Sequence, residues 1–195
     1  MANSLSIDPK KSALVLIDLQ RGVVGRPLAP RSGAEVVQNA ARLAARFRAL
    51  GSTVVLVNVS FHPDFRDVLN LPVDSPQQFN PAALPPNWAE LVPEIGPQPG
   101  DLLITKHQWG AFYGTQLDLQ LRRRDVQTIV LGGIATNIGV ESTARDAYER
   151  GYHQIFAEDA MAGISAEAHE FAIKNIFPRI GKVRATDDVL SALAI

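Results

Sequence analysis

The sequence predicts a three-layer α/β/α fold, in which helices cover both faces of a parallel sheet. Two observations support this prediction. Apolar runs of strand length alternate with helical stretches along the chain, as they do in repeated strand–helix–strand units. Several of these runs are also apolar at nearly every position, whereas a strand with one face in water alternates apolar and polar residues. Parallel strands buried on both faces explain this pattern.

The first strand–helix–strand unit spans residues 12–59. Residues 12–18 (SALVLID) predict a buried strand that ends in the carboxylate of Asp18. Apolar residues recur at helical spacing over 33–50, and the β-branched run 53–59 predicts a second, parallel strand. Ligands bind at the carboxyl ends of strands in an open parallel sheet, so Asp18 is a candidate site residue. The alternative is that its side chain only caps the following turn.

Residues 61–100 predict a long irregular connection, because prolines recur throughout the segment. Within it, only residues 87–91 (NWAEL) predict a short helical turn. A connection of this length is typical of a lid, a binding loop or an oligomer contact. Its apolar residues need packing partners and favour order over disorder; they include Phe61, Leu69, Leu71, Phe79, Leu84 and Trp88.

The next predicted strand, residues 101–105, leads directly to Lys106 and the aromatic-rich stretch HQWGAFYG. A lysine is usually solvated, but a position at a strand end beside aromatic residues makes Lys106 a candidate site residue. Thr115 and Asp118 then have the spacing of a capping box before a helix that contains Leu121.

Residues 129–151 (IVLGGIATNIGVESTARDAYERG) predict a buried strand, a glycine-rich turn and a helix. Thr136 or Asn137 is the expected cap of the helix, its apolar face includes Tyr148, and Gly151 is the expected stop. Free backbone N–H groups at the start of this helix should converge on residues 135–139. The chemistry of the protein is expected at this turn.

The C-terminal part continues the alternation. Residues 153–157 predict a strand that ends in Glu158 and Asp159, and Ser165 is expected to cap a helix that runs through Ile176. Val183 marks a last short strand, and Thr186 opens the final helix.

Length and composition limit the function classes. A chain of 195 residues that is 46% hydrophobic predicts one domain over residues 1–195. With 20 acidic and 19 basic residues, the charges nearly cancel, so nucleic acid is not an expected partner. The absence of cysteine excludes disulfides, thiolate metal sites and a cysteine nucleophile. The sequence shows neither an apolar signal core nor a run of about 20 apolar residues, which predicts a cytoplasmic protein without a membrane partner.

Three segments resemble the isochorismatase-like hydrolase superfamily, which includes nicotinamidases, carbamoylsarcosine amidase-like enzymes and true isochorismatases. These are LIDLQ with Asp18, KHQWGAFYGTQL with Lys106, and the stretch GGIATNIGVESTARDAYERGY. The resemblance implies a Rossmann-like parallel sheet of six strands in the order 3-2-1-4-5-6 and a homo-oligomer, a dimer or larger. It also implies a cis peptide bond between Ile134 and Ala135.

The resemblance further implies a catalytic set of Asp18, Lys106 and Gly139. In the amidase branch, a cysteine activated by the aspartate and the lysine stands where this chain has Gly139. Glycine offers no nucleophile, so no thiolate acyl-enzyme can form. True isochorismatases are similar in carrying glycine there, and they hydrolyse a vinyl ether by protonation and water attack.

The expected substrate-binding residues flank this set: they are Gln20, Trp109, Ile134, Ala135 and Asn137. No cofactor and no metal are expected. Nicotinamidases bind a divalent metal through an Asp-x-His pair and a further histidine, whereas the similar stretch here retains only His62, with Ser60 at the carboxylate position.

These residues lead to one preferred hypothesis and two alternatives. The preferred function is thiol-independent hydrolysis of a small anionic molecule, with Asp18 as acid or base and Lys106 as its electrostatic partner. The first alternative is an amidase that uses water directly. The second is a non-catalytic ligand-binding protein that retains the family pocket.

Overall fold

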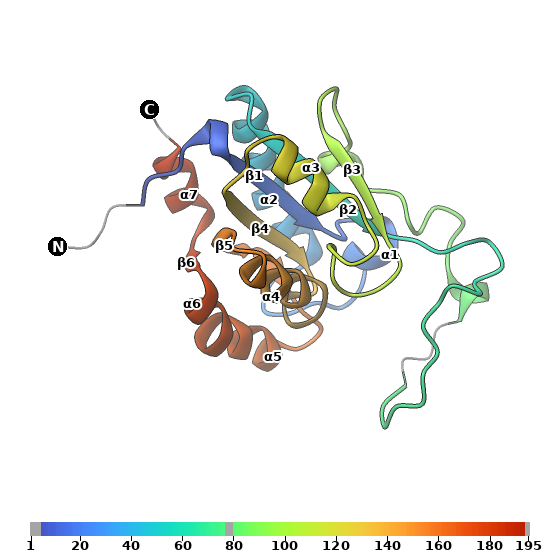
Figure 1. Cartoon of the computed structure of the whole chain (residues 1–195). Coiled ribbons are helices and arrows are strands. Elements are labelled where there is room, and N and C mark those ends of the chain that lie inside the picture. Colours follow the sequence, from blue (N-terminus) through green and yellow to red (C-terminus); the bar gives the residue numbers. More distant parts are fainter. Residues whose placement is uncertain (1–4, 77–79, 194–195) are drawn as a thin grey trace.

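The computed structural model describes residues 5–76 and 80–193 (Figure 1). Within these ranges, six strands form one parallel sheet in the order β3-β2-β1-β4-β5-β6, which confirms the predicted fold class and strand order. The strands are β1 (Ser12–Ile17), β2 (Thr53–Val59), β3 (Leu102–Lys106), β4 (Thr128–Ile134), β5 (His153–Ala162) and β6 (Lys182–Arg184).

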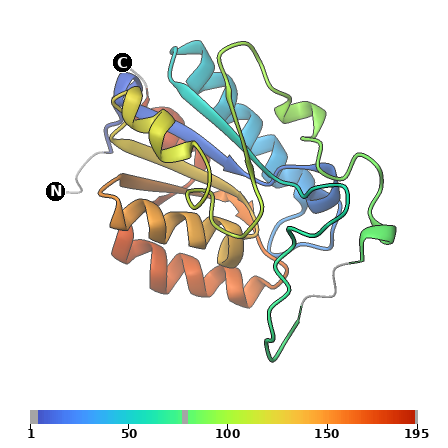
Figure 2. The same cartoon turned by 45° about the vertical axis from the view of Figure 1, so that its right-hand side comes forward.

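Helices cover both faces of the sheet (Figures 1 and 2). The α-helices are α1 (Arg21–Val24), α2 (Gly33–Ala49), α3 (Leu117–Arg123), α4 (Glu141–Glu149), α5 (Ala166–Phe171), α6 (Phe177–Ile180) and α7 (Thr186–Ala192). Single π-helical turns, η4 (Thr136–Val140) and η5 (Ala172–Ile176), precede α4 and α6. Short 3₁₀ turns occur at η1 (Pro9–Lys11), η2 (Pro81–Ala83) and η3 (Pro93–Ile95). Residues of α2 and α7 pack in one apolar cluster, and residues of α3, α4 and α6 pack in the other.

The burial of both faces of the central strand β1 explains why its sequence is continuously apolar. Leu14 and Leu16 belong to the cluster under α2, whereas Val15 and Ile17 belong to the cluster on the opposite face. All of these side chains are buried. Because neither face of β1 meets water, each position is selected for burial, and the alternation typical of a half-exposed strand is absent.

Strand β5 extends further than predicted. It runs to Ala162, so Glu158 and Asp159 lie inside the strand and not at its end. The register between β4 and β5 shifts at this point, which allows polar side chains within a buried strand. Arg31 Nη2 donates to Glu158 Oε2 over 3.0 Å, and the Thr186 amide donates to Asp159 Oδ1 over 2.7 Å.

The predicted caps after β3 and β4 are wrong. The residue before η4 is Ala135, which provides no side-chain cap, and Thr136 instead bonds to His169. Tyr148 is exposed and does not join the apolar face of α4. Asp118 accepts from the Tyr152 hydroxyl over 2.8 Å and does not complete a capping box. Thr136 and Asp118 each bond to a partner distant in sequence, His169 and Tyr152, and neither caps the helix beside it.

The connection between β2 and β3 extends away from the sheet (Figures 1 and 2). Residues 87–89 form a hydrogen-bonded turn and Leu91 a bridge to Gln20, in place of the predicted helical turn. Leu69, Leu71 and Val73 are 68%, 67% and 58% exposed. Phe79, an apolar residue of the same segment, lies outside the described residues. Among the helices that the structure describes, none is long and apolar enough to cross a membrane.

Candidate active site

The candidate site lies where β1 and β4 end side by side. In the strand order 3-2-1-4-5-6, successive connections leave these two strands in opposite directions, and such a switch point opens a crevice beyond the strand ends. Asp18 follows β1 directly and has φ of 53°, in the left-handed region that Asp tolerates better than most residues. Its amide still donates to Val57 O of β2 over 2.9 Å. The chain therefore turns at Asp18 while the residue remains anchored to the sheet.

Asp18 and Lys106 form a buried ion pair. Lys106 ends β3, two strands away from β1, and its Nζ donates to Asp18 Oδ2 over 2.8 Å. The two side chains are only 10% and 2% exposed. Lys106 Nζ also donates to the Gln108 carbonyl over 3.1 Å. In contrast, Asp18 Oδ1 is buried without a hydrogen-bond partner among the residues that the structure describes.

The pKa of Asp18 is shifted toward neutral pH. Burial raises the pKa of Asp18 from 3.8 to about 6, although the Lys106 ammonium acts in the opposite direction through its charge and its hydrogen bond. Desolvation disfavours the carboxylate more than the ammonium favours it. A carboxyl with a pKa in this range can both give and take a proton near neutral pH.

The turn after β4 forms the opposite wall of the site. The Ile134–Ala135 peptide bond is cis, as expected. The chain then enters η4, in which the Ile138 and Val140 amides donate to the Ala135 carbonyl. The N–H groups at the start of a helix have no acceptor within it, and they therefore supply donors to a ligand.

Gly139 faces Asp18 across the site. A β-carbon at Gly139 would lie 3.4 Å from Asp18 Oδ2 and 3.2 Å from Ile17 Cγ2. The space beside the carboxylate is thus left open because residue 139 has no side chain. Thr143 holds the turn in place, since its hydroxyl donates to the Gly139 carbonyl over 2.7 Å and accepts from the Ala111 amide over 3.1 Å.

A cavity of about 240 Å³ opens at these residues. Asp18, Lys106 and Gly139 line it, so the structure brings the predicted catalytic set together. Three predicted binding residues, Trp109, Ile134 and Ala135, also line the cavity. Most of the remaining wall is apolar or aromatic: Val23, Leu28, Val59, Phe61, Val68, Leu69, Leu84, Trp88, Ile138 and Ile164, with Arg26, His107 and Gln108 as further polar members.

Two predicted binding residues lie outside the cavity lining. Gln20 is fully buried, and its amide binds the backbone on both sides: it donates to the Val59 and Trp88 carbonyls and accepts from the Val59 amide over 2.8 Å. It therefore attaches the long connection to the sheet. Asn137 is exposed and does not line the cavity. The binding roles predicted for Gln20 and Asn137 stay predictions, and the cavity lining does not include either residue.

Arg26, Phe61 and Trp88 line the cavity although no sequence pattern marked them as site residues. Arg26 lies in a loop rich in glycine and proline, which has no periodicity that would assign it to a face. Phe61 and Trp88 belong to the long connection, and their rings stack with centroids 6.0 Å apart. The expectation that this connection contains a lid or binding loop was the available signal.

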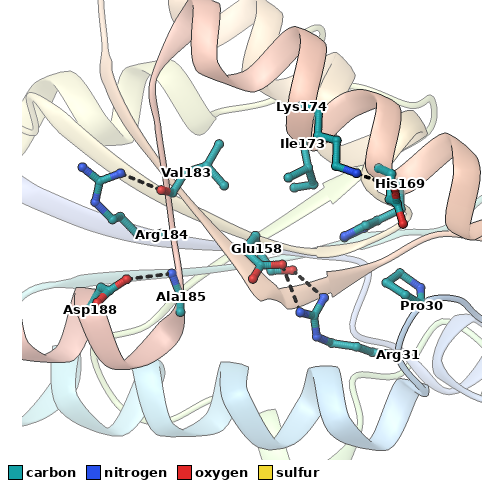
Figure 3. Close-up of a pocket in the computed structure, with 11 residues that line it drawn as sticks. Pro30, Arg31, Glu158, His169, Ile173, Lys174, Val183, Arg184, Ala185 and Asp188 are labelled. Atoms are coloured by element: carbon teal, nitrogen blue, oxygen red, sulfur yellow. Dashed lines mark hydrogen bonds and ion pairs between the residues drawn. The ribbon is translucent and has the colours of Figure 1, made fainter.

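A second cavity, of about 530 Å³, shares no lining residue with the first. Figure 3 shows Arg31 reaching toward Glu158 across it. Lys174 at its rim pairs with Glu170 over 2.7 Å. His169 lines it and is buried, its Nδ1 lies 2.7 Å from Thr136 Oγ1, and burial lowers its pKa. Among the described residues that line it, the carboxylates of Glu158 and Glu170 are paired with Arg31 and Lys174, whereas Asp18 in the first cavity has one carboxyl oxygen buried without a partner.

The metal prediction is not tested by the structure. Among the residues that the structure describes, no group of three or more His, Cys, Asp or Glu side chains is arranged to hold a metal ion. His62 lies 2.8 Å from Asp64, on the exposed connection.

Comparison with known proteins gives consistent results. The family profile described as "Isochorismatase domain" matches residues 12–188. The isochorismatase family protein YwoC of Bacillus subtilis is 55% identical over 190 residues, which cover 97% of this chain and 98% of YwoC. The structure of an isochorismatase family protein from Burkholderia thailandensis superposes with a TM-score of 0.92 at 48% identity, covering 98% of this chain and 99% of that one. The ureidoacrylate amidohydrolase RutB of Cronobacter sakazakii is 30% identical over 217 residues, 98% of this chain and 94% of RutB.

Proposed function

The chain belongs to the isochorismatase family of hydrolases, and we propose that it hydrolyses a small anionic molecule without a thiol nucleophile. The observation that carries this proposal is the state of the Asp18 carboxyl. One oxygen of this carboxyl, Oδ2, is held by Lys106 and lies beside the space left open at Gly139, while the other, Oδ1, is buried without a partner among the described residues. A buried acceptor without a partner is costly, and substrate or an attacking water would satisfy it.

Vinyl-ether hydrolysis needs Asp18 in its neutral form. Asp18 would donate its proton to the vinyl carbon, and water would add to the resulting cation. The adduct would then separate into a carbonyl compound and an alcohol, and the proton released by water would return to Asp18. Lys106 would stabilise the carboxylate that exists between the two transfers.

Amide or ureide hydrolysis by water is a second candidate, and it needs Asp18 ionised. The carboxylate would take a proton from water as the oxygen attacks the carbonyl carbon, and the N–H groups of η4 that do not donate to the Ala135 carbonyl would stabilise the oxyanion. The leaving nitrogen would receive the proton as the C–N bond breaks. A pKa of about 6 favours this candidate at neutral pH, because most Asp18 carboxyls are then ionised. The name of the relative RutB, a ureidoacrylate amidohydrolase, also supports it.

Turnover over a panel of vinyl ethers, amides and ureides tests the proposal and separates the candidates. If Asp18 acts as an acid, kcat/KM should fall as pH rises through about 6; if it acts as a base, kcat/KM should rise over the same interval. In either case Asp18→Asn should lower kcat by roughly 10²–10⁴-fold.

The unfolding midpoint of Asp18→Asn is the control, because loss of the fold would also abolish turnover. A folded Asp18→Asn variant with near-normal kcat would contradict the assignment of Asp18. Tight ligand binding by the wild type, without turnover of any panel member, would support the ligand-binding alternative.

A further inference from the structure

The charged side chains that line the active-site cavity differ in whether they form ion pairs. Its lining, within the described residues, has four ionisable side chains: Asp18, Arg26, Lys106 and His107. The charge of Lys106 is matched by Asp18 at 2.8 Å. His107 lies 3.4 Å from the Asp67 carboxylate. Arg26 forms no ion pair within the part of the chain that the structure describes.

Lys106 is poorly suited to bind a substrate anion. Its ammonium is buried and already donates to Asp18 and to the Gln108 carbonyl. An anion close to Lys106 would also meet the Asp18 carboxylate. The recognition of a substrate anion therefore requires another cation, and Arg26 is the remaining one.

Arg26 is positioned to serve this role. It is exposed at the mouth of the cavity, whereas Asp18 lies buried at its floor. Arg26 Nε donates to the Gly22 carbonyl over 3.0 Å, and the Gly22 amide donates to the Trp88 carbonyl over 2.9 Å. The guanidinium is thereby anchored to the cavity wall by Nε, and its two terminal nitrogens have no partner among the described residues. Two parallel N–H groups match a carboxylate in a bidentate geometry.

The volume and the aromatic lining of the cavity indicate the size and shape of the ligand. The volume of about 240 Å³ is below the range of typical drug-binding pockets, roughly 300–1,000 Å³, so the ligand is small. Phe61, Trp88 and Trp109 supply aromatic surface, which favours a flat apolar group. With Asp18 ionised, its charge cancels that of Lys106, and Arg26 leaves one positive charge for a monoanion.

We propose that Arg26 binds a carboxylate at one end of the substrate, so that the substrate class is small, flat monocarboxylic acids cleaved at their other end beside Asp18. This inference rests on the proposed function for the position of the cleaved bond. The recognition of the carboxylate by Arg26 can be tested separately, without any turnover.

The test compares matched acids and amides as probes of the full-length protein. Benzoate with benzamide, and crotonate with crotonamide, differ in charge but hardly in shape, and their binding is measured by calorimetry or ligand-observed NMR. The wild type should bind each acid at least 10-fold more tightly than its amide. Arg26→Met should abolish this preference. It should weaken binding of the acid by roughly 10- to 100-fold, because it removes a charge-assisted hydrogen-bond pair.

Arg21→Met is the matched control, since Arg21 opens α1 just before the loop that carries Arg26, pairs with Glu90 over 3.5 Å and does not line the cavity. This variant should keep the acid preference of the wild type. Arg26→Lys should restore part of the preference that Arg26→Met loses, because a lysine retains the charge without the bidentate geometry.

Three outcomes would overturn the inference: no acid preference in the wild type for either pair, a preference that survives Arg26→Met, or tighter binding of phenyl phosphate than of benzoate. Failure of this inference can be distinguished from failure of the proposed function. If Asp18→Asn abolishes turnover but Arg26→Met leaves acid recognition unchanged, only the role of Arg26 is wrong.

Discussion

At the scale of single residues, the Asp18–Lys106 pair determines both stability and chemistry. Two charges are buried together, and removal of either leaves the other without compensation. We expect Asp18→Asn and Lys106→Met each to lower the free energy of unfolding by about 3–5 kcal/mol. The double variant should recover most of this loss, because no buried charge remains.

Chemical denaturation at pH 7 measures these free energies as a double-mutant cycle. Losses that simply add in the double variant would show that the two side chains do not stabilise each other. The double variant also serves the functional test, since it should lack the acid while retaining the fold.

At the scale of elements, the site depends on how closely β1 and β4 approach each other. Gly133 pairs with Ile17 and has φ of 122°, and a β-carbon there would lie 2.2 Å from the Ile17 carbonyl oxygen. Gly133→Ala should therefore force the two strands apart just before Asp18 and the turn after Ile134. We expect a loss of at least about 3 kcal/mol in unfolding free energy, together with loss of turnover.

Gly51→Ala is the control for this prediction. Gly51 follows α2 with φ of 68°, but a β-carbon there would meet nothing within 4 Å. Only the left-handed backbone then opposes the substitution, at a cost of about 1–2 kcal/mol. Equal urea midpoints for the two variants would show that the crowding at Gly133 relaxes without cost.

At the scale of the whole molecule, the long connection predicts self-association. Leu69, Leu71 and Val73 are more than half exposed and close together in sequence, and Leu69 also lines the active-site cavity. Clustered exposed apolar side chains mark interaction surfaces. We expect light scattering at micromolar concentration to give at least a dimer, and Leu69→Ser/Leu71→Ser to lower the measured mass.

Leu119→Ser, which changes an exposed leucine of α3 away from this connection, should leave the mass unchanged. A monomeric wild type would contradict the prediction. That residues 1–195 form one domain also remains a prediction; the family match covers residues 12–188 of them.

The sequence by itself determined the fold class, the bounds of β1 to β4 to within one residue at each end, and the strand ends that carry Asp18 and Lys106. It marked β6 only by Val183 and ended β5 too early. These features depend on periodicity, glycine stops and β-branched runs, which act between residues close together in the chain. The resemblance to the hydrolase superfamily added the strand order and the cis Ile134–Ala135 bond.

Only the tertiary structure decided how side chains from distant segments meet. Gln20 bonds to the backbone of β2 and of the long connection, Thr136 bonds to His169 and does not cap a helix, and Arg26 lines the active-site cavity. Each outcome depends on which polar groups and charges remain without a partner after the chain has folded. Local patterns do not contain that information, because the competing partners lie tens of residues away and are brought together only by burial of the core.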